Sequence, residues 1–194
     1  NIGLRQFLRM AKAMKNNIVV GFLCLLCIAY TPAFAATINA SPAESSVMFR
    51  LNHDLGYTVG YFNNFSATLD ANDDQSQIVS ANIQVKTDSI NTRNAIRDEG
   101  LRSSLFLETG KFPQAVFEST KVEGDQVSGL LTIKGIVKPI SFKLERDSAK
   151  KKIVLKGSFN RHDYGITYNP VMAHKKKIIG DRVELIIELN IHAG

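Results

Sequence analysis

The stretch that decides the fold is DRVELIIELNIHA, residues 181–193. Apolar and polar side chains alternate along it with a period of two, which places them on opposite faces of an extended strand. The apolar face carries Val183, Leu185, Ile187, Leu189 and Ile191. This segment therefore predicts a β-strand with one face against a core and the other in water.

The same alternation recurs in seven segments that precede this strand. They are SVMFRL (46–51), NFSATLD (64–70), IVSANIQVK (78–86), PQAVFEST (113–120), QVSGLLTIKG (126–135), PISFKLER (139–146) and KIVLKGSFN (152–160). Short polar turns separate them, so neighbouring strands are expected to run antiparallel. The sequence predicts an all-β fold, an eight-stranded antiparallel barrel, because closing the sheet removes its exposed edges. A sandwich of two sheets is the alternative.

Residues 92–107 break the alternation and are called the helical insert below. Asp98 and Arg102 have the i,i+4 spacing of a helix-supporting ion pair, and Leu101 and Leu105 share one helix face. A short helix that ends before Gly110 is therefore predicted. We interpret it as a lid or plug of the barrel, and the alternative is a structural helix that merely closes one end.

The N-terminal 35 residues have the features of a secretory signal peptide. Four basic residues precede an apolar run over residues 18–30, and the small-residue pattern Ala33-Phe34-Ala35 follows it. We expect cleavage near Ala35, export to the periplasm and one mature domain over residues 36–194. Residues 1–13, before Met14, are interpreted as an upstream extension.

Composition argues against several classes of function. Removal of residues 1–35 takes away four basic residues and no acidic one, so the formal net charge falls from +6 by four to +2 and nucleic-acid binding is not expected. Both cysteines lie inside the signal, and the four histidines lack the spacing of a zinc-binding helix, so no metal site is predicted. Phosphate-binding, dinucleotide-binding and nucleophile-elbow motifs are absent from the sequence, so neither a cofactor nor a catalytic site is predicted.

Four segments in order resemble the YceI-like polyisoprenoid-binding proteins. They are TDSINTRNAIRDEGLRSSLFLETGKFPQAVFEST (87–120), GLLTIKGIVKPISF (129–142), RHDYGI (161–166) and IGDRVELIIEL (179–189). The chain departs from the family pattern at Gly100, where a histidine is usual, at Val137, where a threonine is usual, and around HDLGYTVGYF (53–62).

The resemblance implies an extended lipocalin-like barrel that holds the prenyl chain of an isoprenoid lipid, such as a polyprenyl phosphate or a prenylated quinone. An enzyme that acts on such a lipid and a packed barrel that serves as an interaction module are the alternatives. The three lysines of HKKKIIGD (174–181) suggest peripheral contact with a membrane, with a solvated loop as the alternative, and a homodimer is a further possible assembly.

Strand parity and the resemblance together give a set of candidate ligand-binding residues. The strands supply Phe49, Leu51, Phe65, Ile83, Val85, Phe117, Leu131, Ile133, Phe142, Phe159, Leu185 and Ile187. The helical insert supplies Leu101, Leu105 and Phe106 as inward-facing residues, and His53 is the candidate contact for a lipid head group. An ordinary packed core is the alternative interpretation of the whole set.

Overall fold

The computed structural model describes residues 36–40, 43–72, 77–147, 149, 151–170 and 178–190. All of them belong to the second of two units, which span residues 1–33 and 34–194. The predicted signal peptide and the lysines of residues 175–177 lie outside the described residues.

Antiparallel strands form a single eleven-stranded sheet in the described part of the chain. The strands are β1 (Ala36–Asn39), β2 (Ser46–His53), β3 (Gly56–Phe62), β4 (Phe65–Ala71), β5 (Ile78–Lys86), β6 (Ile90–Asn91), β7 (Gln114–Glu123), β8 (Gln126–Ile133), β9 (Ile136–Asp147), β10 (Lys152–Asn160) and β11 (Ile179–Asn190). Their order across the sheet is β1-β4-β5-β7-β8-β9-β10-β11-β2-β3-β6. The α-helix α2 (Ala95–Arg102) and two short 3-10 helices, η1 (Thr87–Ser89) and η2 (Arg161–Tyr164), complete the described elements.

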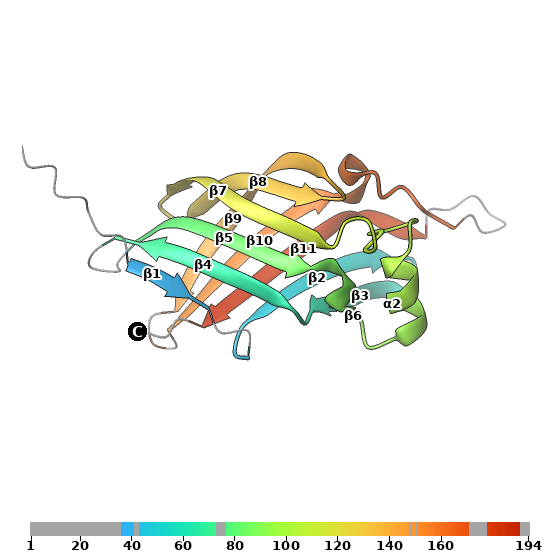
Figure 1. The fold of residues 1–194 in the computed structure, drawn as a ribbon, viewed down its shortest axis with the longest axis horizontal. Helices are drawn as coiled ribbons and strands as arrows, with labels where there is room; N and C mark the ends of the chain where they lie inside the picture. Colours follow the sequence, from blue (N-terminus) through green and yellow to red (C-terminus); the bar gives the residue numbers. More distant parts are fainter. Residues whose placement is uncertain are drawn as a thin grey trace, which may run out of the picture. The chain divides into compact units, whose positions relative to one another are not determined.

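The sheet curls into a half-barrel, with β4, β5 and β7 facing β9, β10 and β11, and α2 lies at one end (Figure 1). The predicted all-β antiparallel fold with a short helical insert is confirmed. The strand count is eleven instead of eight because β1, β3 and β6 were not predicted. β1 and β6 are too short to alternate visibly, and in β3 most residues are exposed or half-buried, so its pattern is weak.

One half of the half-barrel's interior, away from α2, is filled by the protein's own side chains. This filled half contains side chains that are at most 1% exposed, namely Leu69, Ala71, Val127, Ile153, Leu155 and Leu189. Strand register places them near the turns that join β4 to β5, β7 to β8 and β9 to β10. The remaining half, next to α2, contains the candidate site and is called the hollow half.

Candidate functional site

The hollow half encloses an apolar cavity of about 120 Å³ that is partly open to solvent. Its walls come from β2, β3, β5, β6, β7, β8, β9, β10 and β11, and the helical insert covers one side. Thirteen of the sixteen predicted residues line it: Phe49, Leu51, Ile83, Val85, Leu101, Phe106, Phe117, Leu131, Ile133, Phe142, Phe159, Leu185 and Ile187. Their role in ligand binding stays a prediction.

The structure does not bring the other three predicted residues to this cavity. Phe65 is buried in the main core, and Leu105 is 53% exposed. His53 is half-buried at the end of β2, where its Nδ1 atom accepts a hydrogen bond of 3.3 Å from the backbone N–H of Leu55. Parity along β2 places His53 on the same face as Leu51, but the cavity ends before it.

Sequence reasoning missed ten residues of the lining. They are Val47, Phe62, Thr87, Ile90, Leu107, Ala115, Val116, Arg161, Ile166 and Val183. Three of them lie in predicted strands at inward-facing positions, namely Val47, Ala115 and Val183. The alternation therefore already indicated that these side chains face the interior. Phe62 and Ile90 belong to β3 and β6, the strands that the alternation did not reveal.

The helical insert forms the predicted helix, α2, at the expected place. The side chain of Asn94 accepts a hydrogen bond of 3.0 Å from the backbone N–H of Arg97, which caps the first turn. Leu101, Phe106 and Leu107 line the cavity. The insert thus has the geometry of a cover over the hollow half.

The predicted ion pair between Asp98 and Arg102 is wrong. Asp98 is buried, and its Oδ1 atom accepts hydrogen bonds from the backbone N–H of Thr92 at 2.8 Å and from the Thr92 hydroxyl at 2.6 Å. Arg102 instead donates to the carbonyl oxygens of Asp88 at 2.8 Å and Ile90 at 2.9 Å. A buried carboxylate near the start of a helix is stabilised by such donors, and this outweighs a weak surface pair with Arg102.

Arg161 is 1% exposed although it lines an apolar cavity. Its guanidinium donates hydrogen bonds to the carbonyl oxygens of Ile166, Tyr168, Ile179 and Gly180, at distances of 2.6–3.3 Å. Burial lowers the pKa of Arg161, an effect that the nearby carboxylate of Asp181, at 3.6 Å from Nη2, opposes. Arg161 therefore fastens the segment after η2 to β11.

Thr87 is the second polar side chain in the lining, and its hydroxyl donates a hydrogen bond of 2.7 Å to the carbonyl oxygen of Phe112. Both polar liners are thus engaged with the backbone. The surface that the cavity presents to a guest is almost wholly hydrocarbon. Such a surface favours an apolar guest, since each Å² of apolar surface removed from water contributes about 25 cal/mol.

A small polar cluster lies beside the cavity at η2. Tyr164 is 1% exposed, and its ring packs edge-on against Phe159 with 5.0 Å between centroids. Burial, with a smaller contribution from Asp163, raises the pKa of Tyr164 to about 12. The Nε2 atom of His162 lies 3.3 Å from Oδ1 of Asp181. These groups do not line the cavity, so the geometry gives them no contact with a guest there.

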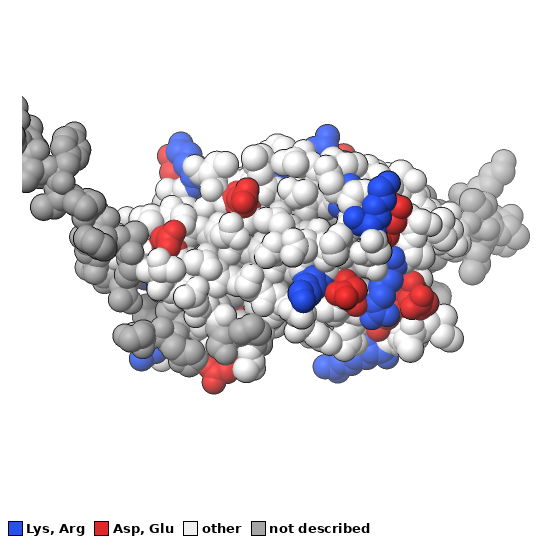
Figure 2. Space-filling model, viewed as in Figure 1, with Lys and Arg blue, Asp and Glu red and all other residues white. Residues whose placement is uncertain are grey.

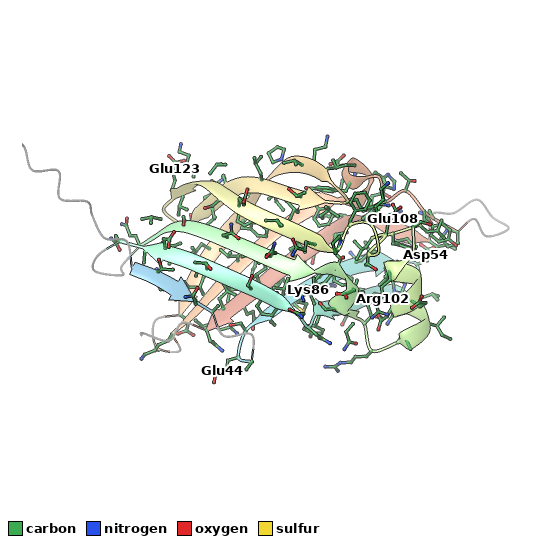
Figure 3. All side chains as sticks on the ribbon, in the orientation of Figure 1. Glu44, Asp54, Lys86, Arg102, Glu108 and Glu123 are labelled. Atoms are coloured by element: carbon green, nitrogen blue, oxygen red, sulfur yellow. The ribbon has the colours of Figure 1, made fainter. Side chains whose placement is uncertain are left out.

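Charged side chains are sparse over β4, β5 and β7 and gather near α2 (Figure 2). Arg102, Glu108 and Asp54 lie at the α2 end of the sheet, and Glu123 lies at the opposite end (Figure 3). Within the described ranges, no three His, Cys, Asp or Glu side chains are grouped to hold a metal ion. None of the helices in these ranges is long and apolar enough to cross a membrane.

Comparison with known sequences finds a family model and many relatives. The model of the YceI-like domain matches residues 39–191. A UPF0312 protein of Shewanella putrefaciens is 37% identical over 139 residues, which cover 67% of this chain and 72% of that protein. Protein YceI of Salmonella arizonae is 37% identical over 136 residues, or 66% of this chain and 71% of that protein.

Comparison with solved structures finds the same fold. BcnA of Burkholderia cenocepacia matches with a TM-score of 0.63 and 19% identity, over 79% of this chain and 99% of that one. A polyisoprenoid binding domain from Saccharophagus degradans, implicated in plant cell wall breakdown, matches with a TM-score of 0.57 and 17% identity, over 81% and 99% of the two chains. The YCEI protein of Campylobacter jejuni has a TM-score of 0.56 and 23% identity, over 70% and 85%.

Proposed function

The chain belongs to the YceI-like family, and from this premise we propose that it is a binding protein that encloses the prenyl chain of an isoprenoid lipid. The observation that carries the proposal is the apolar cavity of the hollow half, whose two polar liners are both engaged with the backbone. The polyisoprenoid binding domain of Saccharophagus degradans, which has a similar fold, supports this choice of ligand class.

The physics of the cavity suits a hydrocarbon chain. A prenyl chain offers almost only apolar surface, and its transfer out of water is worth about 0.8 kcal/mol for each buried CH₂ group. Several isoprene units therefore provide ample binding free energy without hydrogen bonds. A polar head group would find no unengaged partner among Thr87 and Arg161, so it stays outside the cavity.

The size of the cavity requires that the hollow half widens when a lipid enters. Its volume of about 120 Å³ lies below the roughly 300–1,000 Å³ of typical small-molecule sites. The helical insert is the element suited to move, because Leu101 and Leu107 contact the rest of the hollow half through apolar side chains. The contacts of Asp98 with Thr92 lie inside the insert and can travel with it. The hydrogen bonds from Arg102 to the carbonyl oxygens of Asp88 and Ile90 leave the insert and must break or shift when it moves.

We further propose that the protein is exported to the periplasm after cleavage near Ala35 and there carries or sequesters a polyprenyl phosphate or a prenylated quinone. The basic start and the apolar run of residues 18–30 support export. A binding role without catalysis agrees with a cavity whose two polar side chains already have backbone partners. The helical insert is proposed to act as the lid.

Mass spectrometry of an organic extract tests the proposal. Protein purified from bacteria that express the full chain is expected to release a species with a prenyl chain. A Val85→Phe variant supplies the matched control, because the larger ring fills the cavity and should remove the lipid. Wild-type protein that carries no prenyl species and binds no added prenyl alcohol would refute the function.

A further inference from the structure

Exposed apolar side chains are concentrated at the α2 end of the sheet. Nine large hydrophobic residues are exposed among those that the structure describes. Seven of them belong to segments at this end, and we call them the apolar rim: Leu55, Tyr57, Ile96, Leu105, Ile136, Val137 and Tyr168. Leu55 and Ile96 are 92% and 88% exposed, respectively. Of the other two, Val79 lies on β5 away from the rim, and Leu130 lies on β8, where the strand register places it next to the rim residue Val137.

Contacts between the segments show that they meet at one end. The turn between β2 and β3 is tied to the start of β11, because the backbone N–H of Asp54 donates to the carbonyl oxygen of Ile178 at 3.1 Å. Asn169 joins the same place, because its Oδ1 atom accepts from the backbone N–H of Ile178 at 3.0 Å. This brings Tyr168, the neighbour of Asn169, close to the turn that carries Leu55.

The helical insert and the turn between β8 and β9 complete the rim. The ring of Tyr168 contacts that of Phe106 edge-on, with 5.4 Å between centroids. Lys134, in the turn before Ile136, donates a hydrogen bond of 3.2 Å to the carbonyl oxygen of Ser104. Figure 3 shows three labelled residues at this end of the sheet, Asp54, Arg102 and Glu108.

The rim is the outer surface of the segments that cover the cavity. Phe106 and Ile166 line the cavity from inside, whereas Leu105 and Tyr168, which lie close to them in sequence, are exposed outside. An exposed apolar surface of this kind is a usual mark of a protein or membrane contact. Here it surrounds the cover of a hydrocarbon cavity, so a guest that leaves a membrane through the rim avoids exposure to water.

We propose that the apolar rim docks onto a lipid bilayer with anionic lipids, so that the hollow half exchanges its guest directly with the membrane. This inference rests on the proposed function. Leu55 and Ile96 are the insertion points because they are the most exposed rim residues.

Two exposed cations beside the helical insert suit contact with anionic lipid head groups. Arg93 and Lys111 are exposed cations that form no ion pair among the described residues, whereas the acidic Glu108 and Glu99 are paired with Lys134 and Arg102. Tyr57, with the guanidinium of Arg50 stacked 4.3 Å from its ring centroid, has the amphipathic character of side chains at membrane interfaces.

Vesicle flotation with a matched pair of double variants tests the docking. The rim variant is Leu55→Glu with Ile96→Glu, and the control is Val79→Glu with Thr120→Glu, which adds the same charge at exposed positions away from the rim. Each protein is expressed from the full chain and purified after any N-terminal processing by the cells. It is then mixed with vesicles of phosphatidylethanolamine and phosphatidylglycerol. Binding of a fluorescent prenyl alcohol in the absence of vesicles is measured in parallel.

Docking predicts that the rim variant loses vesicle association at least tenfold while it binds the prenyl alcohol within about twofold of wild type. The control variant should behave like wild type in both assays. Flotation of the rim variant at the wild-type level, or equal losses in both double variants, would overturn the docking. Wild-type protein that binds the prenyl alcohol but does not float would overturn it too and leave the proposed function intact. Wild-type protein that fails to bind the prenyl alcohol would instead refute the proposed function, on which the docking rests.

Discussion

The filled half and the hollow half of the interior are built from the same strands, yet only one of them has room for a guest. On β11, Leu189 is completely buried in the filled half, and Leu185, four residues earlier on the same face, lines the cavity. In the filled half, Ala71 and Ala81 are at most 2% exposed. Side chains this short are fully buried because neighbouring apolar side chains pack over them and leave no open space.

The hollow half is built differently. Its lining consists largely of Phe, Leu, Ile and Val side chains, and a separate insert covers it. Asp98 fixes the start of the insert from within, and Arg102 ties its end to the backbone of η1 and β6. Apolar side chains of the insert pack against the walls. Leucine, isoleucine and valine occur in both halves, so the comparison links the cavity to the end of the curled sheet that the insert covers.

The largest expected effect comes from a pair of leucines on β11. Leu189→Ala should lower the free energy of unfolding by about 2–5 kcal/mol, because the filled half cannot collapse around the lost side chain. Leu185→Ala should cost less than about 1.5 kcal/mol, because Leu185 already borders open space. Urea denaturation of both variants measures the difference. Equal losses would mean that the two halves are packed alike.

Two valine-to-phenylalanine substitutions test the same difference in packing by adding volume to each half of the interior. Val127→Phe in the filled half should lower the free energy of unfolding by about 1–3 kcal/mol, because the ring has no room there. Val85→Phe in the hollow half should change it by less than about 1 kcal/mol, because the ring enters the cavity. Thermal and urea unfolding of the two variants check this, and a larger loss for Val85→Phe would argue against a vacant space.

The cover of the hollow half depends on Asp98. Asp98→Ala should lower the free energy of unfolding by about 1–3 kcal/mol, because the backbone N–H of Thr92 then loses its buried acceptor. Glu99→Ala is the control on the same helix, since the Glu99 side chain is 84% exposed, and it should cost less than about 0.5 kcal/mol. Amide hydrogen exchange should show faster exchange confined to α2 in Asp98→Ala. Unchanged exchange there would contradict this role of Asp98.

The smallest effect appears only at high pH. Burial raises the pKa of Tyr164 from about 10 to about 12, so between these values the unfolded chain releases a proton that the folded chain keeps. The free energy of unfolding should therefore fall as pH rises from 10 to 12. Tyr164→Phe should flatten this decline, and Tyr168→Phe, at a 39% exposed tyrosine, should not. Urea midpoints of the wild type and of both variants, measured across this pH range, show whether the decline is flatter in Tyr164→Phe alone.

Alternation along the sequence predicts which side chains face inward, but not whether they touch each other across the interior. Phe65 and Phe117 have the same inward parity, yet Phe65 is absent from the cavity lining and Phe117 lines it. Phe65 pairs with the cavity-lining Val85, but it lies on β4, which supplies no residue to the lining, and which strands border the cavity is set by the curl of the whole sheet. Arg161 could not be identified either, because its burial depends on backbone carbonyls of a later segment.

Methyl NMR during titration with a prenyl alcohol shows where the hydrocarbon binds, because it follows both halves of the interior in one sample. The methyl resonances of Ile83, Leu131 and Leu185, which line the cavity, are expected to shift strongly. Those of Leu69, Leu155 and Leu189, in the filled half, should stay near their starting positions. Shifts of equal size in both halves, or shifts confined to the outer surface, would contradict the binding of the hydrocarbon in the hollow half.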